Sequence, residues 1–242
     1  MLPVKFSSNG WCPICEEKVL FSSTSNWFRD SLLCSKCASI PRERALMRTI
    51  DEIYPNYRDL VIHETSPVNR GASSKLLKTC TKYTTSQYFK NVKLGTLHKS
   101  GVRCENLECL TFADACFDIF ISQDVMEHVF DPISAFREIH RVLKPGGAHI
   151  FTVPLINKWR PSERWASLDN NGAIVHYGAP EYHGNPVDPD GALVTMHWGY
   201  DIAAFIAEQA KMSTIIIKID DIGQGIRAEF IEVLVSIRNF TS

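Results

Sequence analysis

Residues 110–154, LTFADACFDIFISQDVMEHVFDPISAFREIHRVLKPGGAHIFTVP, decide the fold of this chain. The segment 117–122 is short, apolar and β-rich, as expected for a strand buried on both faces. Asp131-Pro132 predicts the N-cap and first residue of a helix whose apolar positions recur every three or four residues. Pro145-Gly146-Gly147 is expected to end that helix, and 149–153 to form the next strand. Two buried strands joined by a helix predict a right-handed parallel crossover in an α/β sheet.

The letters within this stretch are more specific than its periodicity. In chain order they are Leu110 and Phe112, Phe117-Asp118, Glu127-His128, and the run from Arg141 to Gly147. This order resembles the class I S-adenosylmethionine-dependent methyltransferases, over about residues 59–154 and most strongly in the second half. The resemblance implies a doubly wound, mostly parallel seven-stranded sheet of Rossmann-like topology. The alternative is another doubly wound nucleotide-binding sheet.

The bulk properties limit the classes of function. A chain of 242 residues is long enough for one large domain with a small appendage. The net charge of −1 and the absence of a Lys/Arg run make a nucleic-acid partner unlikely. No apolar run has the length of a signal peptide or membrane span, and there are eight cysteines. We therefore expect a cytoplasmic protein with reduced thiols and no membrane partner; no feature indicates an oligomeric state.

Four of the cysteines form two C-x-x-C pairs, Cys12/Cys15 and Cys34/Cys37, with eighteen residues between them. Two such turns that face each other provide four thiolates for a tetrahedral Zn²⁺ site. Four protein ligands leave no position for water, so this zinc would be structural and would supply folding free energy. A redox role for the pairs and four unliganded thiols are the less favoured alternatives.

A helix is predicted to start after Ser39 and to run to about Ile53. A cysteine pair followed by a small residue and Pro-Arg-x-Arg resembles a subgroup of methyltransferases that carry an N-terminal cysteine knuckle. The resemblance implies a knuckle at 1–40, a linking helix at 41–58 and a methyltransferase domain at 59–242. Arg42 and Arg44 are candidate contacts for an anionic substrate, but solvated or acid-paired arginines are the favoured interpretation.

The first sheet strand is predicted at 59–64 and is followed by the segment that, in this family, holds the methionine end of the cofactor. The expected acid is present as Glu64, whereas Thr65 and Pro67 stand where the first two glycines are expected. Ser66 and Pro67 nevertheless predict an N-cap and first helical residue. The resemblance thus makes Glu64 and Ser66 cofactor-binding candidates in a loop that has lost its usual glycines.

Three further positions follow from the resemblance. Arg70 is hypothesised to bind the cofactor carboxylate that the glycine loop usually holds. At the end of the strand near 83–89, Gln87 stands where the family usually has an acid for the ribose hydroxyls. Asn106-Leu107 aligns with the step that recognises adenine, through an amide side chain and a backbone group.

Asp124, at the carboxyl end of the strand at 117–122, is expected to line the cleft between the cofactor and the acceptor. His128 is either a general base for a hydroxyl acceptor or a structural histidine. Between residues 155 and 198 the chain becomes rich in Pro, Gly, His and aromatic residues, which is typical of a lid. Its His176 and His183 complete the set of candidate catalytic residues.

The lid admits two other interpretations. A metal site built from His176, Glu181 and His183 is conceivable, although no spacing fixes these residues together. The second interpretation is an irregular insertion whose aromatic residues merely pack, such as those in His176-Tyr177 and His197-Trp198. After the lid, a helix is predicted at about 201–211, with strands at 213–219 and 229–237 that match the antiparallel hairpin closing the sheet in this family.

We therefore predict an S-adenosylmethionine-dependent methyltransferase that acts on a small-molecule or glycan-like acceptor, at oxygen. Neutral charge and the His/aromatic composition of the lid favour that acceptor class. The alternatives are an RNA or protein methyltransferase that grips its substrate with the zinc knuckle, a catalytically silent binding protein on the same fold, and a different enzyme that uses the same cleft with a metal held by the lid.

Overall fold

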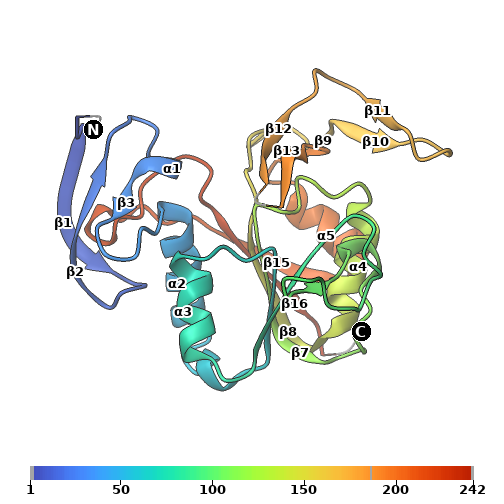
Figure 1. Ribbon diagram of the computed structural model, residues 1–242, viewed down its shortest axis with the longest axis horizontal. Coiled ribbons are helices and arrows are strands. Elements are labelled where there is room, and N and C mark those ends of the chain that lie inside the picture. The colour runs from blue at the N-terminus through green and yellow to red at the C-terminus, as the bar shows by residue number, and fades with distance from the viewer. Residues whose placement is uncertain (1–2, 186, 241–242) are drawn as a thin grey trace.

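A computed structural model describes residues 3–185 and 187–240 of the chain. Its centre is a seven-stranded sheet with the order β15-β16-β8-β7-β4-β5-β6 (Figure 1). The strands β4 to β8 pair in parallel, and β16 runs antiparallel to both of its neighbours. The strands are β4 (Ile62–Thr65), β5 (Tyr83–Gln87), β6 (Arg103–Cys104), β7 (Phe117–Gln123), β8 (Leu143–Thr152), β15 (Met212–Ile217) and β16 (Val233–Arg238). The predicted mostly parallel α/β fold is confirmed.

Helices cover both faces of the sheet. The helices α2 (Pro41–Ile53) and α3 (Gly71–Thr79) lie on one face, and α4 (Pro132–Val142) and α5 (Ile202–Ala210) on the other (Figure 1). Because successive side chains of a strand point to opposite faces, β7 buries Ile119 and Ile121 in one core and Phe120 in the other. The predicted burial on both faces is thus observed. Among the described residues, no helix is both long and apolar enough to cross a membrane.

Two predicted boundaries are wrong. The helix α4 ends at Val142, and Pro145-Gly146-Gly147 lies inside β8, because Leu143 is already extended and pairs with Phe117. The shift in register between Phe117 and Ile119 absorbs this early start. Ser66 and Pro67 do not begin α3, which starts at Gly71. The reason is the backbone of Ser66, whose φ of 54° is left-handed rather than the extended conformation of an N-cap.

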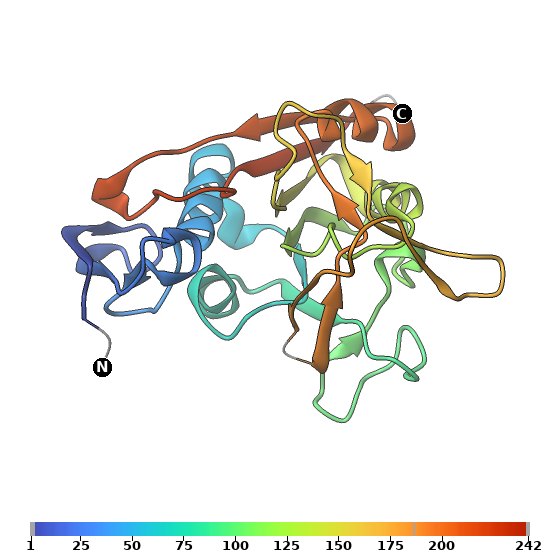
Figure 2. The same ribbon diagram turned by 90° about the horizontal axis from the view of Figure 1, so that it is seen from above.

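The N-terminal module comprises residues 3–40. Its three-stranded antiparallel sheet joins β1 (Phe6–Cys12), β2 (Glu17–Ser23) and β3 (Leu33–Cys34), and the short helix α1 (Phe28–Ser31) precedes β3. Phe21 and Leu32 of this module belong to the same buried cluster as α2 and one face of the central sheet. The module is therefore packed into the main core, at the end of the molecule opposite the lid (Figures 1 and 2).

Arg44 fastens this module to the rest of the chain. The side chain is fully buried, and its guanidinium donates to the carbonyl oxygens of Ser39, Leu32 and Gly225 and lies 4.7 Å from the Phe21 ring centre. The expectation that Arg44 is solvated or paired with an acid is wrong. Its N–H groups instead donate to three backbone carbonyls and to the Ser39 hydroxyl, at a junction of three segments.

The lid at 155–198 folds into three two-stranded sheets, in which β9 pairs with β14, β10 with β11, and β12 with β13. The β10–β11 hairpin projects away from the body of the molecule (Figures 1 and 2). Trp198 is fully buried in the core under α4 and α5, so it is not an aromatic platform for ligands. The lid strands are β9 (Glu163–Arg164), β10 (Ala166–Leu168), β11 (Ile174–His176), β12 (Tyr182–Asn185), β13 (Asp188–Leu193) and β14 (Met196–His197).

Three short 3-10 helices lie outside the lid in the described part of the chain. They are η1 (Tyr57–Asp59), η2 (Leu107–Cys109) and η3 (Ile222–Gln224).

Candidate active site

The parallel strands β4, β5 and β6 end at one edge of the sheet. There the amide of Ser66 donates to the carbonyl of Ser86 at 2.8 Å, and the amide of Glu105 donates to the carbonyl of Gln87 at 3.2 Å. These contacts bring Ser66, Gln87 and the Asn106-Leu107 step to neighbouring strand ends. Ligands of open α/β sheets bind at this edge, so the structure brings together three of the predicted cofactor positions.

Glu64 is the centre of a buried hydrogen-bond network rather than an exposed acid. Its carboxylate accepts from Ser73 Oγ at 2.7 Å, from Gln123 Nε2 at 2.8 Å and from the Tyr83 hydroxyl. Burial raises the pKa of Glu64, although these three donors oppose the shift. Both carboxylate oxygens are engaged by protein donors, so Glu64 fixes the loop after β4 against α3 and β5.

The loop 65–70 differs from the sequence expectation in two respects. Ser66, rather than Thr65 or Pro67, has the left-handed backbone that glycine favours. Arg70 is not free at the edge: its Nε lies 2.9 Å from Oε1 of Glu43, a fully buried carboxylate of α2. The pair ties the loop to the linking helix and leaves the Arg70 side chain 42% exposed.

Gly71 makes this contact between α2 and α3 possible. Its φ is 54°, and a Cβ at this position would lie 2.2 Å from Oε2 of Glu43. We expect Gly71→Ala to lower the free energy of unfolding by more than the 1–3 kcal/mol, roughly, of a strained backbone alone, as measured by urea denaturation. Gly172→Ala is the matched control, because Gly172 has a φ of 79° and open space around it. Equal losses in the two variants would contradict the contact with Glu43.

Asp124 lies at the carboxyl end of β7, as predicted, and is buried by the N-terminal module. Its carboxylate is 2.6 Å from Nη2 of Arg29 and 3.1 Å from Nε of Arg42, and it accepts from Thr152 Oγ1 at 2.9 Å. Burial acts to raise the pKa of Asp124, but the charges of Arg42 and Arg29 outweigh it and the pKa is lowered. Arg42 is thus acid-paired, as favoured. The sequence analysis did not identify Arg29 as a partner of Asp124, because the four-residue helix α1 is too short to show an apolar periodicity.

The loop after β7 and the lid meet in the region predicted for the acceptor. His128 and His183 come together there, with ring centres 5.0 Å apart, beside the buried carboxylate of Glu127. The amide of Thr195 donates to the carbonyl of Glu127 at 2.7 Å, which docks the lid onto this loop. His176 lies apart: it is exposed on β11 and does not join the cluster. The alternative metal site of His176, Glu181 and His183 is therefore wrong, because His176 lies away from the other two residues.

The four knuckle cysteines converge in the N-terminal module. The Sγ atoms of Cys12 and Cys37 are 3.8 Å apart, as are those of Cys15 and Cys34, and all four lie within 4.8 Å of one another. A tetrahedral Zn²⁺ with Zn–S bonds of about 2.3 Å separates its ligands by about 3.8 Å. The donor set and spacing therefore fit a zinc ion.

Known proteins match this chain in part. Residues 68–151 match the model of a family described as "Methyltransferase domain". A malonyl-[acyl-carrier protein] O-methyltransferase from Marinomonas sp. is 29% identical over 37% of this chain and 33% of its own length. A ubiquinone biosynthesis O-methyltransferase from Parvibaculum lavamentivorans is 33% identical over 24% of this chain and 25% of its own length. The chain thus spans a third or less of these relatives.

A solved structure supports the fold over a longer region. The S-adenosylmethionine-dependent methyltransferase from Mesorhizobium loti superposes with a TM-score of 0.50 at 16% identity, over 80% of this chain and 97% of the other. At that identity the similarity concerns the fold. Residues 68–151 are therefore similar in sequence to a methyltransferase domain, and the fold of the chain is similar to that of the solved structure.

Proposed function

We propose that this chain transfers a methyl group from S-adenosylmethionine to an oxygen of a small or glycan-like acceptor. The proposal depends chiefly on one observation. The segment that matches the methyltransferase domain runs from the loop after β4 into β8, and it therefore includes the loops that follow β5, β6 and β7. Open α/β sheets bind ligands at such carboxyl ends of their strands. The O-methyltransferases among the relatives are consistent with transfer to oxygen, although another relative is a dimethylglycine N-methyltransferase.

The residues at the sheet edge suit the three parts of this cofactor. The loop 65–70 would hold the methionine end, the amide of Gln87 the ribose hydroxyls, and Asn106-Leu107 the adenine. Gln123 donates from Nε2 to Glu64, which precedes this loop, and its amide oxygen is buried without a hydrogen-bond partner among the described residues. The cofactor supplies an activated methyl group when bound, so the protein's task is alignment and exclusion of water.

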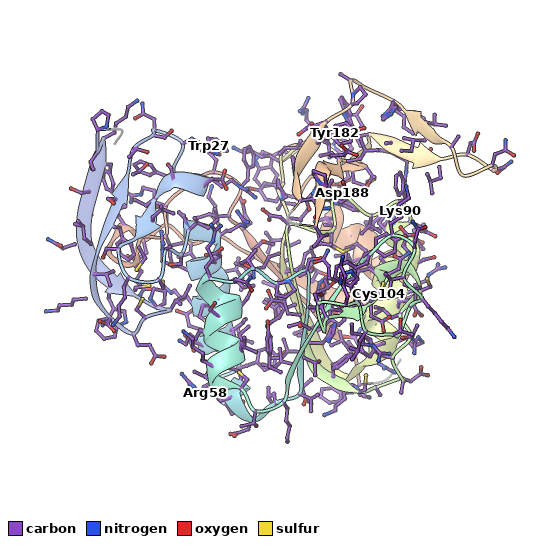
Figure 3. All side chains as sticks on the ribbon, viewed as in Figure 1. Trp27, Arg58, Lys90, Cys104, Tyr182 and Asp188 are labelled. Carbon is purple, nitrogen blue, oxygen red and sulfur yellow. The ribbon has the colours of Figure 1, made fainter. Side chains whose placement is uncertain are left out.

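The acceptor would approach between the N-terminal module and the lid. Asp124 is neutralised by two arginines and is therefore a poor base. His128 donates from Nδ1 to the carbonyl of Leu193 at 2.9 Å, and its Nε2 faces Glu127 Oε1 at 3.7 Å. Figure 3 shows Trp27 of the module and Tyr182 of the lid on the same side of the molecule, and both side chains are about half exposed. Such aromatic surfaces suit hydroxylated ligands.

We further propose that Cys12, Cys15, Cys34 and Cys37 bind a structural Zn²⁺. The fitted sulfur spacing supports this, and the module has little apolar interior of its own beyond what it shares with α2. The metal would supply the free energy that orders the loops carrying the two cysteine pairs.

Calorimetric titration with S-adenosylmethionine and with its demethylated product tests the cofactor proposal. We expect both to bind zinc-loaded protein at micromolar concentration and Gln87→Ala to weaken both, because the ribose contact is lost. Tyr177→Ala, in the exposed lid hairpin, is the control and should bind as wild type. No binding of either compound at high micromolar concentration would indicate a silent binding protein, and salt-dependent RNA binding would favour the knuckle as a substrate grip.

A further inference from the structure

Glu127 is a buried carboxylate that has no hydrogen-bond donor. The residue is 2% exposed, and within the described part of the chain neither carboxylate oxygen has a hydrogen-bond partner. A carboxylate removed from water is costly unless a cation or a proton compensates its charge. Two imidazole nitrogens face it instead: Oε1 lies 3.7 Å from Nε2 of His128 and 3.7 Å from Nδ1 of His183.

Each imidazole is oriented through its other nitrogen. Nδ1 of His128 lies 2.9 Å from the carbonyl oxygen of Leu193, which can only accept, so Nδ1 carries the proton and Nε2 keeps its lone pair. Nε2 of His183 lies 3.3 Å from Oε1 of Glu181, which leaves Nδ1 directed at Glu127. The second oxygen of Glu181 is in turn 3.0 Å from Nε2 of His197. A carbonyl or carboxylate behind each ligating histidine is the usual outer shell of a metal site.

We propose that Glu127, His128 and His183 bind a divalent transition-metal ion with open coordination positions. Their ligand atoms all lie within 4.8 Å of one another. Around a tetrahedral ion with bonds of about 2.1 Å, ligand atoms are about 3.4 Å apart, so small side-chain shifts close the site. Two imidazoles and one carboxylate suit Zn²⁺, Mn²⁺, Fe²⁺ or Co²⁺. Three protein ligands leave room for water or a substrate oxygen, in contrast to the four cysteines.

The surrounding charges favour a cation at this point. Arg29 is the guanidinium whose field reaches Glu127, but it is already paired with Asp124 at 2.6 Å. Glu127 and Glu181 therefore place two carboxylates around imidazoles, and among the described residues no lysine or arginine forms an ion pair with either of them. The ion would also join the β7 loop to the lid, because His183 belongs to β12 and the carbonyl of Glu127 is the group on which Thr195 docks.

The position of the site suggests what the ion would do. An acceptor hydroxyl that replaced a metal-bound water would be held at the carboxyl edge of the sheet, on the side where the lid closes. This role rests on the proposed methyl transfer, whereas the metal site itself does not. The experiment below therefore measures metal binding in the absence of S-adenosylmethionine.

Titration of the full chain, loaded with one equivalent of Zn²⁺ only, with Mn²⁺ tests the site through the EPR signal of free Mn²⁺. The limiting Zn²⁺ fills the four thiolates first and leaves the site of Glu127, His128 and His183 open. Mn²⁺ prefers oxygen and nitrogen ligands, so the cysteines do not compete for it. We expect about one ion per chain. His183→Ala and Glu127→Gln should each weaken binding by at least about 100-fold, and Glu181→Gln by about 10- to 100-fold, as is usual for an outer-shell partner.

His176→Ala is the matched control, a lid histidine outside the cluster, and should bind Mn²⁺ as wild type. Circular dichroism of each variant verifies the fold, which matters most for Glu127→Gln because that residue is buried. The His183 side chain is 36% exposed, so its truncation should disturb the core less. Wild-type protein that binds no Mn²⁺, or a folded His183→Ala variant with unchanged affinity, would overturn the site. Cofactor binding in calorimetry together with no Mn²⁺ binding would reject the metal site alone.

Discussion

Replacing Cys34 by serine should abolish zinc binding at the four-cysteine site and destabilise the whole chain, not only its N-terminal module. A serine hydroxyl is a poor replacement for a thiolate, and structural Zn²⁺ contributes apparent free energies of about 10–16 kcal/mol in small zinc domains. Here the loops carrying the cysteines pack into the core shared by α2 and the central sheet. We expect a loss of several kcal/mol, which lowers the melting temperature by about 10 °C for a domain of this size.

Cys109→Ser provides the control, since Cys109 is an exposed free cysteine outside the four-sulfur cluster. It should retain about one zinc per chain and the wild-type melting temperature, measured by metal analysis and thermal unfolding on the same samples. A Cys34→Ser protein that keeps its zinc and its melting temperature would show that the four thiols do not form a metal site.

Apolar periodicity made the central elements predictable. The alternation of Ile119, Phe120 and Ile121 between two cores and the Asp131 N-cap are local properties of the chain, and both occur as expected. Boundaries were less predictable where pairing partners intervene. Leu143 becomes extended because Phe117 lies beside it, and no window around Leu143 reveals that neighbour.

The cofactor edge could be placed through a family resemblance and the parallel topology. Its details could not, because they depend on α2, an element about twenty residues earlier in the chain. Arg70 was expected to face a ligand carboxylate, whereas the structure pairs it with the carboxylate of Glu43. The sequence around Gly71 also did not indicate that the absence of a Cβ there makes room for the Glu43 side chain.

The acceptor side was the least predictable part of the site. His128 and His183 were each singled out by residue type, but their partnership depends on how the lid folds back over the β7 loop. Glu127 drew no attention as a ligand, because an acid beside a histidine is common in loops. Only burial, with the absence of a donor among the described residues, distinguishes it from an ordinary surface carboxylate.

The contact of Asp124 with Arg29 of the N-terminal module and with Arg42 of α2 should be the strongest polar link of these two elements to the sheet. All three side chains are at most 14% exposed, so loss of one partner leaves an uncompensated buried charge. We expect Asp124→Asn to lower the free energy of unfolding at pH 7 by about 3–5 kcal/mol, measured by urea denaturation. Arg48→Ala, which breaks the more exposed pair with Asp221, should cost under about 1 kcal/mol.

The pH dependence gives this prediction a second readout. Because the folded pKa of Asp124 lies below its unfolded value of about 3.9, the stabilisation is present above that value and is lost as the pH falls through the folded pKa. The difference in stability between wild type and Asp124→Asn should therefore shrink in acid below about pH 4, while Arg48→Ala shows no comparable trend. A difference that stayed constant down to the pH at which wild type unfolds would mean that Asp124 acts through packing rather than charge. In that case the module would be held to the site by its apolar core and by Arg44, and Arg29 and Arg42 would be free to meet an anionic acceptor.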